Sequence, residues 1–135
     1  MKLADLYTRP TANTSRKMYV ELPDGTSSDE YYLEVLNVES DAFRIAETNA
    51  KRKAVEYARL EDEDEISEKQ RALEADMLAS LVVGWNFEDK FSKGAVIELL
   101  TESAGNRDKL ARFSATRSHW FSVKPKSSSG GSKKD

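Results

Sequence analysis

The chain has 135 residues, of which 39% are hydrophobic and 33% are charged, and its formal net charge is −3. This length and composition are typical of a single domain with one modest core and a heavily charged surface. Cysteine is absent, which excludes disulfides and thiolate metal sites, and the single histidine, His119, excludes a histidine-rich zinc site. No secretory signal and no apolar run of about 18 residues is present. We therefore expect a soluble protein without a metal or cofactor.

The net charge conceals a polarity along the chain. Residues 61–76 hold eight acidic and two basic residues, a net charge of −6, whereas residues 106–135 hold eight basic and two acidic residues, a net charge of +6. One interpretation is two solvated surfaces of opposite sign. The other is head-to-tail self-association, or packing of the two regions on each other, in which complementary charge sets the orientation.

The N-terminal part combines an irregular segment with an alternating one. Residues 1–13 contain Pro10 and lack periodicity, so we expect an extended arm. Strand-like alternation follows up to Leu22, and residues 31–36 are again rich in aromatic and aliphatic side chains. Between them, Pro23-Asp24-Gly25 suits a turn, because proline presets φ and glycine tolerates a positive φ. Residues 15–38 therefore predict a β-hairpin, which must pack on helices or another sheet to be stable.

Four helices are predicted next, at about 41–60, 67–84, 93–103 and 106–121. Suitable N-terminal caps precede the first three, namely Ser40 or Asp41, Ser67 and Ser92. The five adjacent acids at 61–65 repel one another, so we expect a loop or a frayed helix end there. Gly84 suits the end of the second helix, and Ala104-Gly105-Asn106 separates the last two. A narrow stripe of Phe43, Ala46, Ala50 and Ala54 along the first helix would let a neighbour approach closely.

The predicted fold class is α+β and mainly α: an N-terminal β-hairpin followed by about four helices. One domain is expected over residues 14–122. From Lys124 the chain has no apolar content, and we expect a disordered tail over residues 123–135.

Six aromatic residues are candidates either for a partner surface or for closure of the core. They are Trp85, Phe87, Phe91, Phe113, Trp120 and Phe121. Side chains of this size dominate protein cores and interfaces alike. The two tryptophan segments could pack together and close the domain. The residues alone leave both roles open.

Catalytic and metal-binding patterns are weak by comparison. No pair of acids is singled out for acid–base chemistry, and no nucleophile elbow or phosphate-binding glycine loop is present. Residues 61–65 lack the glycine and the alternating oxygen ligands of a calcium loop. We therefore expect a binding or assembly protein rather than an enzyme.

Several short segments carry a resemblance to a known family. They are Leu81-Val82-Val83-Gly84-Trp85-Asn86-Phe87, Phe91, Val96-Ile97-Glu98-Leu99-Leu100, Leu110-Ala111-Arg112-Phe113-Ser114, Arg117 and Trp120-Phe121. Together they resemble the tail assembly chaperones of long-tailed phages, over about residues 30–121. In that family a V-x-G-W segment precedes a leucine-pair helix, and a final helix closes in a paired aromatic, commonly Phe-Phe. This chain has Trp-Phe there and lacks the proline expected near Ala104-Gly105.

The resemblance implies a non-enzymatic chaperone of the host cytoplasm that is absent from the mature virion. Such proteins bind the long, helical tape measure protein and keep it soluble while tail tube subunits polymerise around it. Many also have a longer, frameshifted form whose extension recruits the tail tube protein. A helical client needs apolar grooves, which the stripe of Phe43, Ala46, Ala50 and Ala54 could line. Multiple copies of the chaperone would add avidity.

Two other functional classes stay open. A structural tail component, such as a completion or tube terminator protein, would add its hairpin to neighbouring sheets and would be found in purified particles. A small nucleic-acid-binding regulator would use the basic residues Arg107, Lys109, Arg112 and Arg117, and its affinity would fall steeply with salt. The sequence pI of about 5.3 argues against nucleic acid as a partner.

Overall fold

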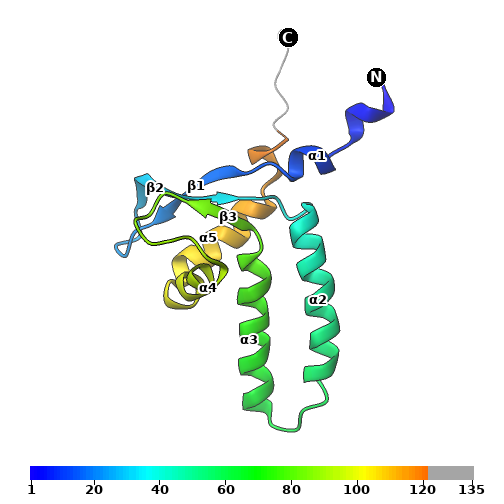
Figure 1. The fold of residues 1–135 in the computed structure, drawn as a ribbon, viewed down its shortest axis with the longest axis vertical. Coiled ribbons are helices and arrows are strands. Elements are labelled where there is room, and N and C mark those ends of the chain that lie inside the picture. Colours follow the sequence, from blue (N-terminus) through cyan, green and yellow to red (C-terminus); the bar gives the residue numbers. More distant parts are fainter. Residues whose placement is uncertain (122–135) are drawn as a thin grey trace.

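The computed structural model describes residues 1–121 and is α+β, mainly α (Figure 1). Its helices are α1 (Arg9–Ala12), α2 (Asp41–Tyr57), α3 (Glu63–Ala79), α4 (Lys93–Glu102) and α5 (Ala104–Ala115), with 3₁₀ turns at Leu3–Leu6 and Arg117–His119. Its strands are β1 (Arg16–Glu21), β2 (Ser27–Val35) and β3 (Val82–Trp85). The predicted fold class is confirmed. The disorder predicted for residues 123–135 concerns a segment outside the described residues.

The predicted hairpin forms from β1 and β2, which pair antiparallel with Met18 opposite Leu33. Gly25 adopts a φ of +90° in the turn, and its N–H donates to the carbonyl of Leu22 over 2.8 Å. The Asp24 carboxylate accepts hydrogen bonds from the hydroxyl and the N–H of Thr26, which lowers the pKa of Asp24. The turn chemistry read from the sequence therefore accounts for the hairpin.

Residues 82–85 form a strand and not the end of a helix, so the predicted helix 67–84 is wrong at its C-terminal end. Helix α3 ends at Ala79, and β3 then pairs antiparallel with β2, with Trp85 opposite Leu33. The sheet order is β1-β2-β3. The two valines and Trp85 suit a strand as well as a helix, and pairing with the free edge of β2 buries Val82. Gly84 lies beside Glu34, whose carboxylate oxygen would be 2.9 Å from a Cβ at that position.

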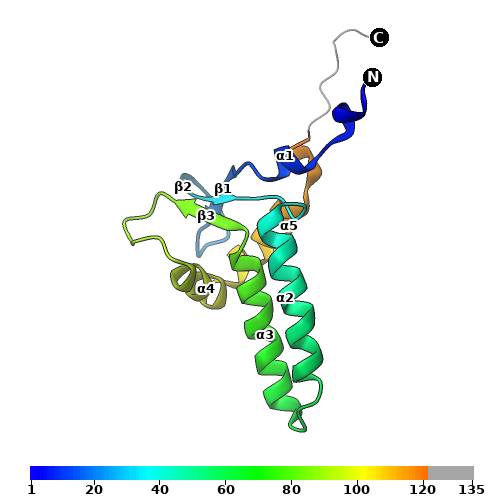
Figure 2. The ribbon, with the colours of Figure 1, turned by 45° about the vertical axis from the view of Figure 1, so that its right-hand side comes forward.

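Helices α2 and α3 form an antiparallel helical hairpin that extends away from the sheet (Figures 1 and 2). Ser40 caps α2 as predicted, but α3 begins at Glu63, four residues before the predicted cap Ser67. The Asp62 carboxylate accepts from the backbone N–H groups of Asp64 and Glu65, over 2.9 and 3.4 Å. Of the five acids expected to form a loop or a frayed helix end, Glu63, Asp64 and Glu65 form the first turn of α3, where the helix dipole favours negative charge.

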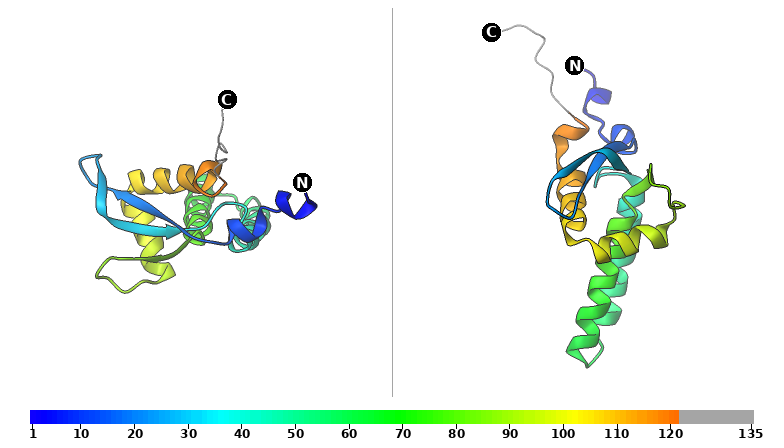
Figure 3. Two further views of the ribbon diagram at one scale, coloured as in Figure 1. Left: turned by 90° about the horizontal axis from the view of Figure 1, so that it is seen from above. Right: turned by 90° about the vertical axis from the view of Figure 1, so that its left-hand side faces the viewer.

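The core lies between the sheet and the helices α3, α4 and α5 (Figure 3). Its fully buried side chains are Met18, Leu33, Val35, Leu81, Val96, Leu100 and Leu110. No helix within residues 1–121 has the length and apolar character needed to cross a membrane.

The last predicted helix, 106–121, has different bounds in the structure. Helix α5 starts at Ala104, because Ser103 caps it, and ends at Ala115. Thr116 then takes an extended backbone conformation, and a 3₁₀ turn brings Trp120 back to the body of the protein. The indole N–H of Trp120 donates to the carbonyl of Thr14 over 2.8 Å. The break in the helix therefore accompanies the burial of Trp120, which is 6% exposed.

The N-terminal arm is helical and partly attached, so the extended arm predicted for residues 1–13 is wrong. Pro10 lies in the first turn of α1, where its missing N–H costs nothing. Ala12 is fully buried, and Arg9 forms a double hydrogen bond to Asp41, with distances of 2.7 and 2.9 Å. Asn13 accepts from the backbone N–H of Asp41 over 2.8 Å. These contacts attach α1 to the start of α2.

Candidate functional site

The six predicted aromatic residues divide between two clusters. The first contains Trp85, Phe87 and Phe91, together with Tyr31, which the sequence did not single out. The ring centroids of Trp85 lie 5.4 Å from Phe87 and 5.1 Å from Phe91, both in edge-to-face geometry. Tyr31 stacks on Phe87 at 5.6 Å. We call these four residues the β3 aromatic cluster.

The cluster is positioned by β3 and by the loop that joins it to α4 (Figure 1). Trp85 lies opposite Leu33, and its indole N–H donates to the carbonyl of Asp89 over 2.9 Å. The side chain of Asn86 accepts from Tyr32 N–H over 2.9 Å and donates to Glu30 carbonyl over 2.8 Å. The Asn86 side-chain amide thus attaches the loop to β2, because it bonds to a backbone N–H and a backbone carbonyl of β2 as a neighbouring strand would. Two backbone attachments hold the aromatic rings in a fixed arrangement at the surface.

An apolar groove runs between this cluster and α4. It consists of two adjoining pockets of about 250 and 430 Å³, which share Phe87, Leu99 and Glu102. We call it the α4 groove. Its apolar lining comes from Val20, Leu22, Pro23, Trp85, Phe87, Ala95 and Leu99, and its acidic rim from Glu21, Asp89, Glu98 and Glu102.

The second aromatic cluster closes the end of the described chain. Phe113 lies 4.0 Å from the His119 ring and 5.5 Å from Trp120, between centroids. The Arg117 guanidinium lies 4.8 Å from the ring centroid of Phe121 and forms an ion pair with Glu39. Trp120 is only 6% exposed. Among residues 1–121, no aromatic pair within stacking distance connects this cluster to Trp85, so the two tryptophans do not pack together as predicted.

The alanine stripe of α2 faces α3. Phe43 and Ala50 are buried, and Ala46 and Ala54, which share their face, are half-buried against the second arm of the helical hairpin. The small side chains let α3 approach closely, as predicted for a neighbour, but the neighbour belongs to the same chain. The stripe is therefore not an open groove.

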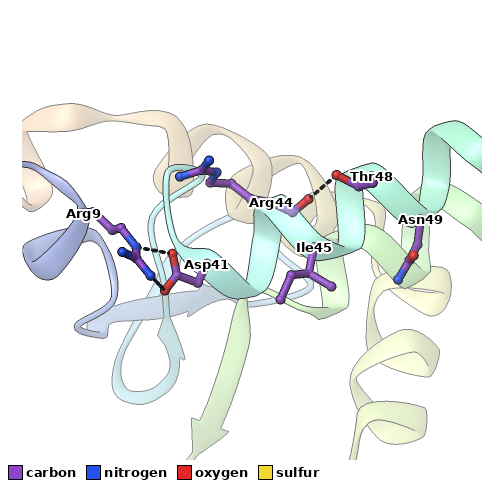
Figure 4. A pocket seen from close by; sticks show the side chains of 6 residues that line it. All are labelled: Arg9, Asp41, Arg44, Ile45, Thr48 and Asn49. Carbon is purple, nitrogen blue, oxygen red and sulfur yellow. Dashed lines mark hydrogen bonds and ion pairs between the residues drawn. The ribbon is translucent and has the colours of Figure 1, made fainter.

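A wider, shallower pocket of about 600 Å³ lies on the outer face of α2 (Figure 4). Its charged groups already pair, because Arg9 donates to Asp41; this hydrogen bond lowers the pKa of Asp41 and raises that of Arg9. Thr48 donates to the carbonyl of Arg44 on its own helix. Ile45 is the main apolar contact that the pocket offers. Its groups hold α1 on α2 and offer little to a ligand.

Within residues 1–121 the structure contains no group of three or more histidine, cysteine, aspartate or glutamate side chains arranged to hold a metal ion. The acids of residues 61–65 lie around the start of α3 and not in a ligand loop. The α4 groove is an exposed and largely apolar feature that two of the predicted aromatic residues, Trp85 and Phe87, line.

Residues 10–112 match a family model described as phage tail assembly chaperone. The match spans 103 of 135 residues, from α1 into α5, and includes the β3 aromatic cluster and α4. No curated protein and no solved structure matches the chain. Because the family model covers most of the sequence, the chain belongs to the phage tail assembly chaperone family.

Proposed function

We propose that this chaperone binds the tape measure protein, keeps it soluble and helps tail tube subunits to polymerise around it. Family membership supports a role in tail assembly. The observation that carries the finer proposal is the α4 groove, where Trp85, Phe87 and Leu99 present apolar surface at the side of a helix. An amphipathic helix binds to such a groove through its apolar face. The tape measure protein, being long and helical, offers that face repeatedly.

This function needs binding and no catalysis. Single grooves of this size bind weakly, so several chaperones on one client would act through avidity. We place the activity in the host cytoplasm, late in infection, with the chaperone released before the virion is mature. Recruitment of the tail tube protein belongs to a longer, frameshifted form of the chain.

The structural alternative, in which the hairpin adds to sheets of neighbouring subunits, receives little support from the sheet edges. Asn106 pairs with both the N–H and the carbonyl of Glu21, over 2.8 and 2.9 Å, at the end of β1. The other edge, β3, is only four residues long. Short or capped edges are poor templates for strand addition.

Co-expression with the tape measure protein of the same phage tests the proposal. We expect the client to become soluble and to co-purify with several copies of the chaperone. The control is the same client expressed without the chaperone. A client that stays insoluble with both the short and the frameshifted form would contradict the proposal, and detection of the chain in purified virions would favour the structural alternative.

A further inference from the structure

We propose that the α4 groove selects client segments in which large apolar side chains are flanked by lysine or arginine. This inference rests on the proposed function and adds to it a binding surface and the chemistry of the segment bound. Three observations support it. The lining of the groove is apolar, its rim is acidic, and the neighbouring pocket between α3, α4 and α5 has charges of both signs.

The floor suits large apolar anchors. Trp85 of β3, Phe87 of the loop after it and Leu99 of α4 all line it. The two pockets, of about 250 and 430 Å³, have room for one or two large side chains each. Phe91, next to Trp85, is 37% exposed, so the apolar surface continues beyond the pocket. Burial of such rings at an interface is a main source of binding free energy.

The rim carries charge of one sign. Glu21, Asp89, Glu98 and Glu102 line the groove, and no basic residue does. None of the four carboxylates forms an ion pair within residues 1–121. Glu98 and Glu102 are four residues apart on α4 and thus lie on the same side of it. A client with basic side chains at matching spacing would neutralise both.

The neighbouring groove provides the contrast. Helices α3, α4 and α5 border a pocket of about 510 Å³ whose charged residues are Glu68, Asp76, Arg71 and Arg107. Both signs are present, and Asp76 already pairs with Lys93 over 3.0 Å. That surface has no preference for one sign of charge. The selection for basic segments therefore belongs to the α4 groove, where the rim is uniformly acidic.

The free ends of the chain fit this groove less well than an external segment. Residues 1–8 expose Leu3, Leu6 and Tyr7, but Lys2 and Asp5 cancel in charge. Residues 122–135 hold four lysines and one aspartate, but their apolar side chains are the small Val123 and Pro125. Neither end combines large apolar anchors with net positive charge.

The test uses peptides of about 20 residues tiled along the tape measure protein and the full-length chaperone labelled with ¹⁵N. We expect the peptides that bind to combine aromatic or aliphatic residues with lysine or arginine. They should shift the indole N–H resonance of Trp85, which lines the groove, and leave that of Trp120 in place. Shifts at Trp120 alone, or binding only by acidic peptides, would overturn the inference.

Charge variants make the test quantitative. Glu98→Gln with Glu102→Gln should weaken binding of the basic peptides about tenfold at low salt. The control, Glu56→Gln with Glu63→Gln, changes the net charge equally at two exposed helix positions outside the groove, and it should weaken binding less than twofold. Equal losses in the two variants would overturn the inference. All four side chains are exposed, so both variants should fold.

Failure of this inference is distinguishable from failure of the proposed function. If the client co-purifies equally with the wild type and with the Glu98→Gln, Glu102→Gln variant, the function stands and the groove assignment falls. If no client is bound by the wild type, the function itself falls. A Trp85 shift that appears on concentrating the chaperone alone, and disappears when residues 1–7 are removed, would assign the groove to a second copy and overturn the client assignment.

Discussion

Two tryptophans of similar prominence in the sequence have different surroundings in the structure. Trp120 is buried and donates to the backbone of Thr14, more than 100 residues away in sequence. Trp85 is half-buried, and its indole N–H donates to Asp89 within its own loop. The first ring connects distant parts of the fold, whereas the second supports a local surface. The two tryptophans are the same residue type, but they differ in the exposure of the ring and in the acceptor of the indole N–H.

Trp120→Ala should lower the free energy of unfolding by about 3 kcal/mol, because it removes a buried ring from between Phe113 and Thr14. Urea denaturation followed by circular dichroism measures the change. Trp85→Ala is the matched comparison, with a smaller loss of stability and a larger loss of client binding. Equal losses of stability would contradict the separation of the two clusters.

At the scale of elements, the attachment of α1 to α2 depends on Arg9 and Asp41. The hydrogen bond from Arg9 lowers the pKa of Asp41 in the folded state relative to the unfolded state. A carboxyl group shifted this way stabilises the fold fully above its unfolded pKa, and the stabilisation is lost as pH falls through the folded value. The pair is exposed to solvent, so its contribution is small and sensitive to salt.

Asp41→Asn should therefore release α1 without unfolding the core. We expect faster amide hydrogen exchange at residues 9–13 at neutral pH, measured by NMR, with unchanged exchange in β2. The difference between variant and wild type should shrink as the pH is lowered through the pKa of Asp41. A difference that persisted below that pH would show that the ionised carboxylate is not what attaches α1.

At the scale of the whole molecule, opposite charges lie far apart. The acids of residues 61–65 lie at the tip of the helical hairpin, whereas α5, which holds Arg112, lies beside the sheet (Figure 1). The tip is therefore not neutralised by packing within the described chain. The predicted packing of residues 61–76 on residues 106–135 is limited, among the described residues, to the pocket that Glu68, Asp76 and Arg107 line. No ion pair joins the two regions within residues 1–121. Solvated surfaces and head-to-tail association both fit this geometry.

If charge orders copies head to tail, then Glu63→Lys, Asp64→Lys and Glu65→Lys together should abolish self-association of the chaperone. Sedimentation velocity at low and high salt measures this, and salt should weaken the wild-type association in the same way. Asp29→Lys, at an exposed position of β2, serves as a control for a single reversal away from the tip. Unchanged association of the triple variant would remove the electrostatic interpretation.

The elements that the sequence predicted well depend on local chemistry. The Pro23-Asp24-Gly25 turn sets the hairpin through bonds within five residues. Ser40 and Ser92 cap helices as predicted, each by accepting a bond from an N–H three residues on. The aromatic V-x-G-W segment and the leucine-pair helix likewise carried the family resemblance. Such features can be predicted from the sequence because the interactions that cause them join residues that are only a few positions apart in the chain.

The features that the sequence did not predict depend on distant partners. Residues 82–85 become a strand because β2 offers a free edge about 50 residues earlier, and periodicity over four residues cannot separate strand from helix. The alanine stripe is covered by α3, and Tyr31 reaches Phe87 only through the pairing of β2 and β3. The sequence by itself determined the composition, the hairpin turn, the caps at Ser40 and Ser92 and the family. Only the tertiary structure decided which aromatic residues form the groove and which close the core, because burial is a property of the assembled chain.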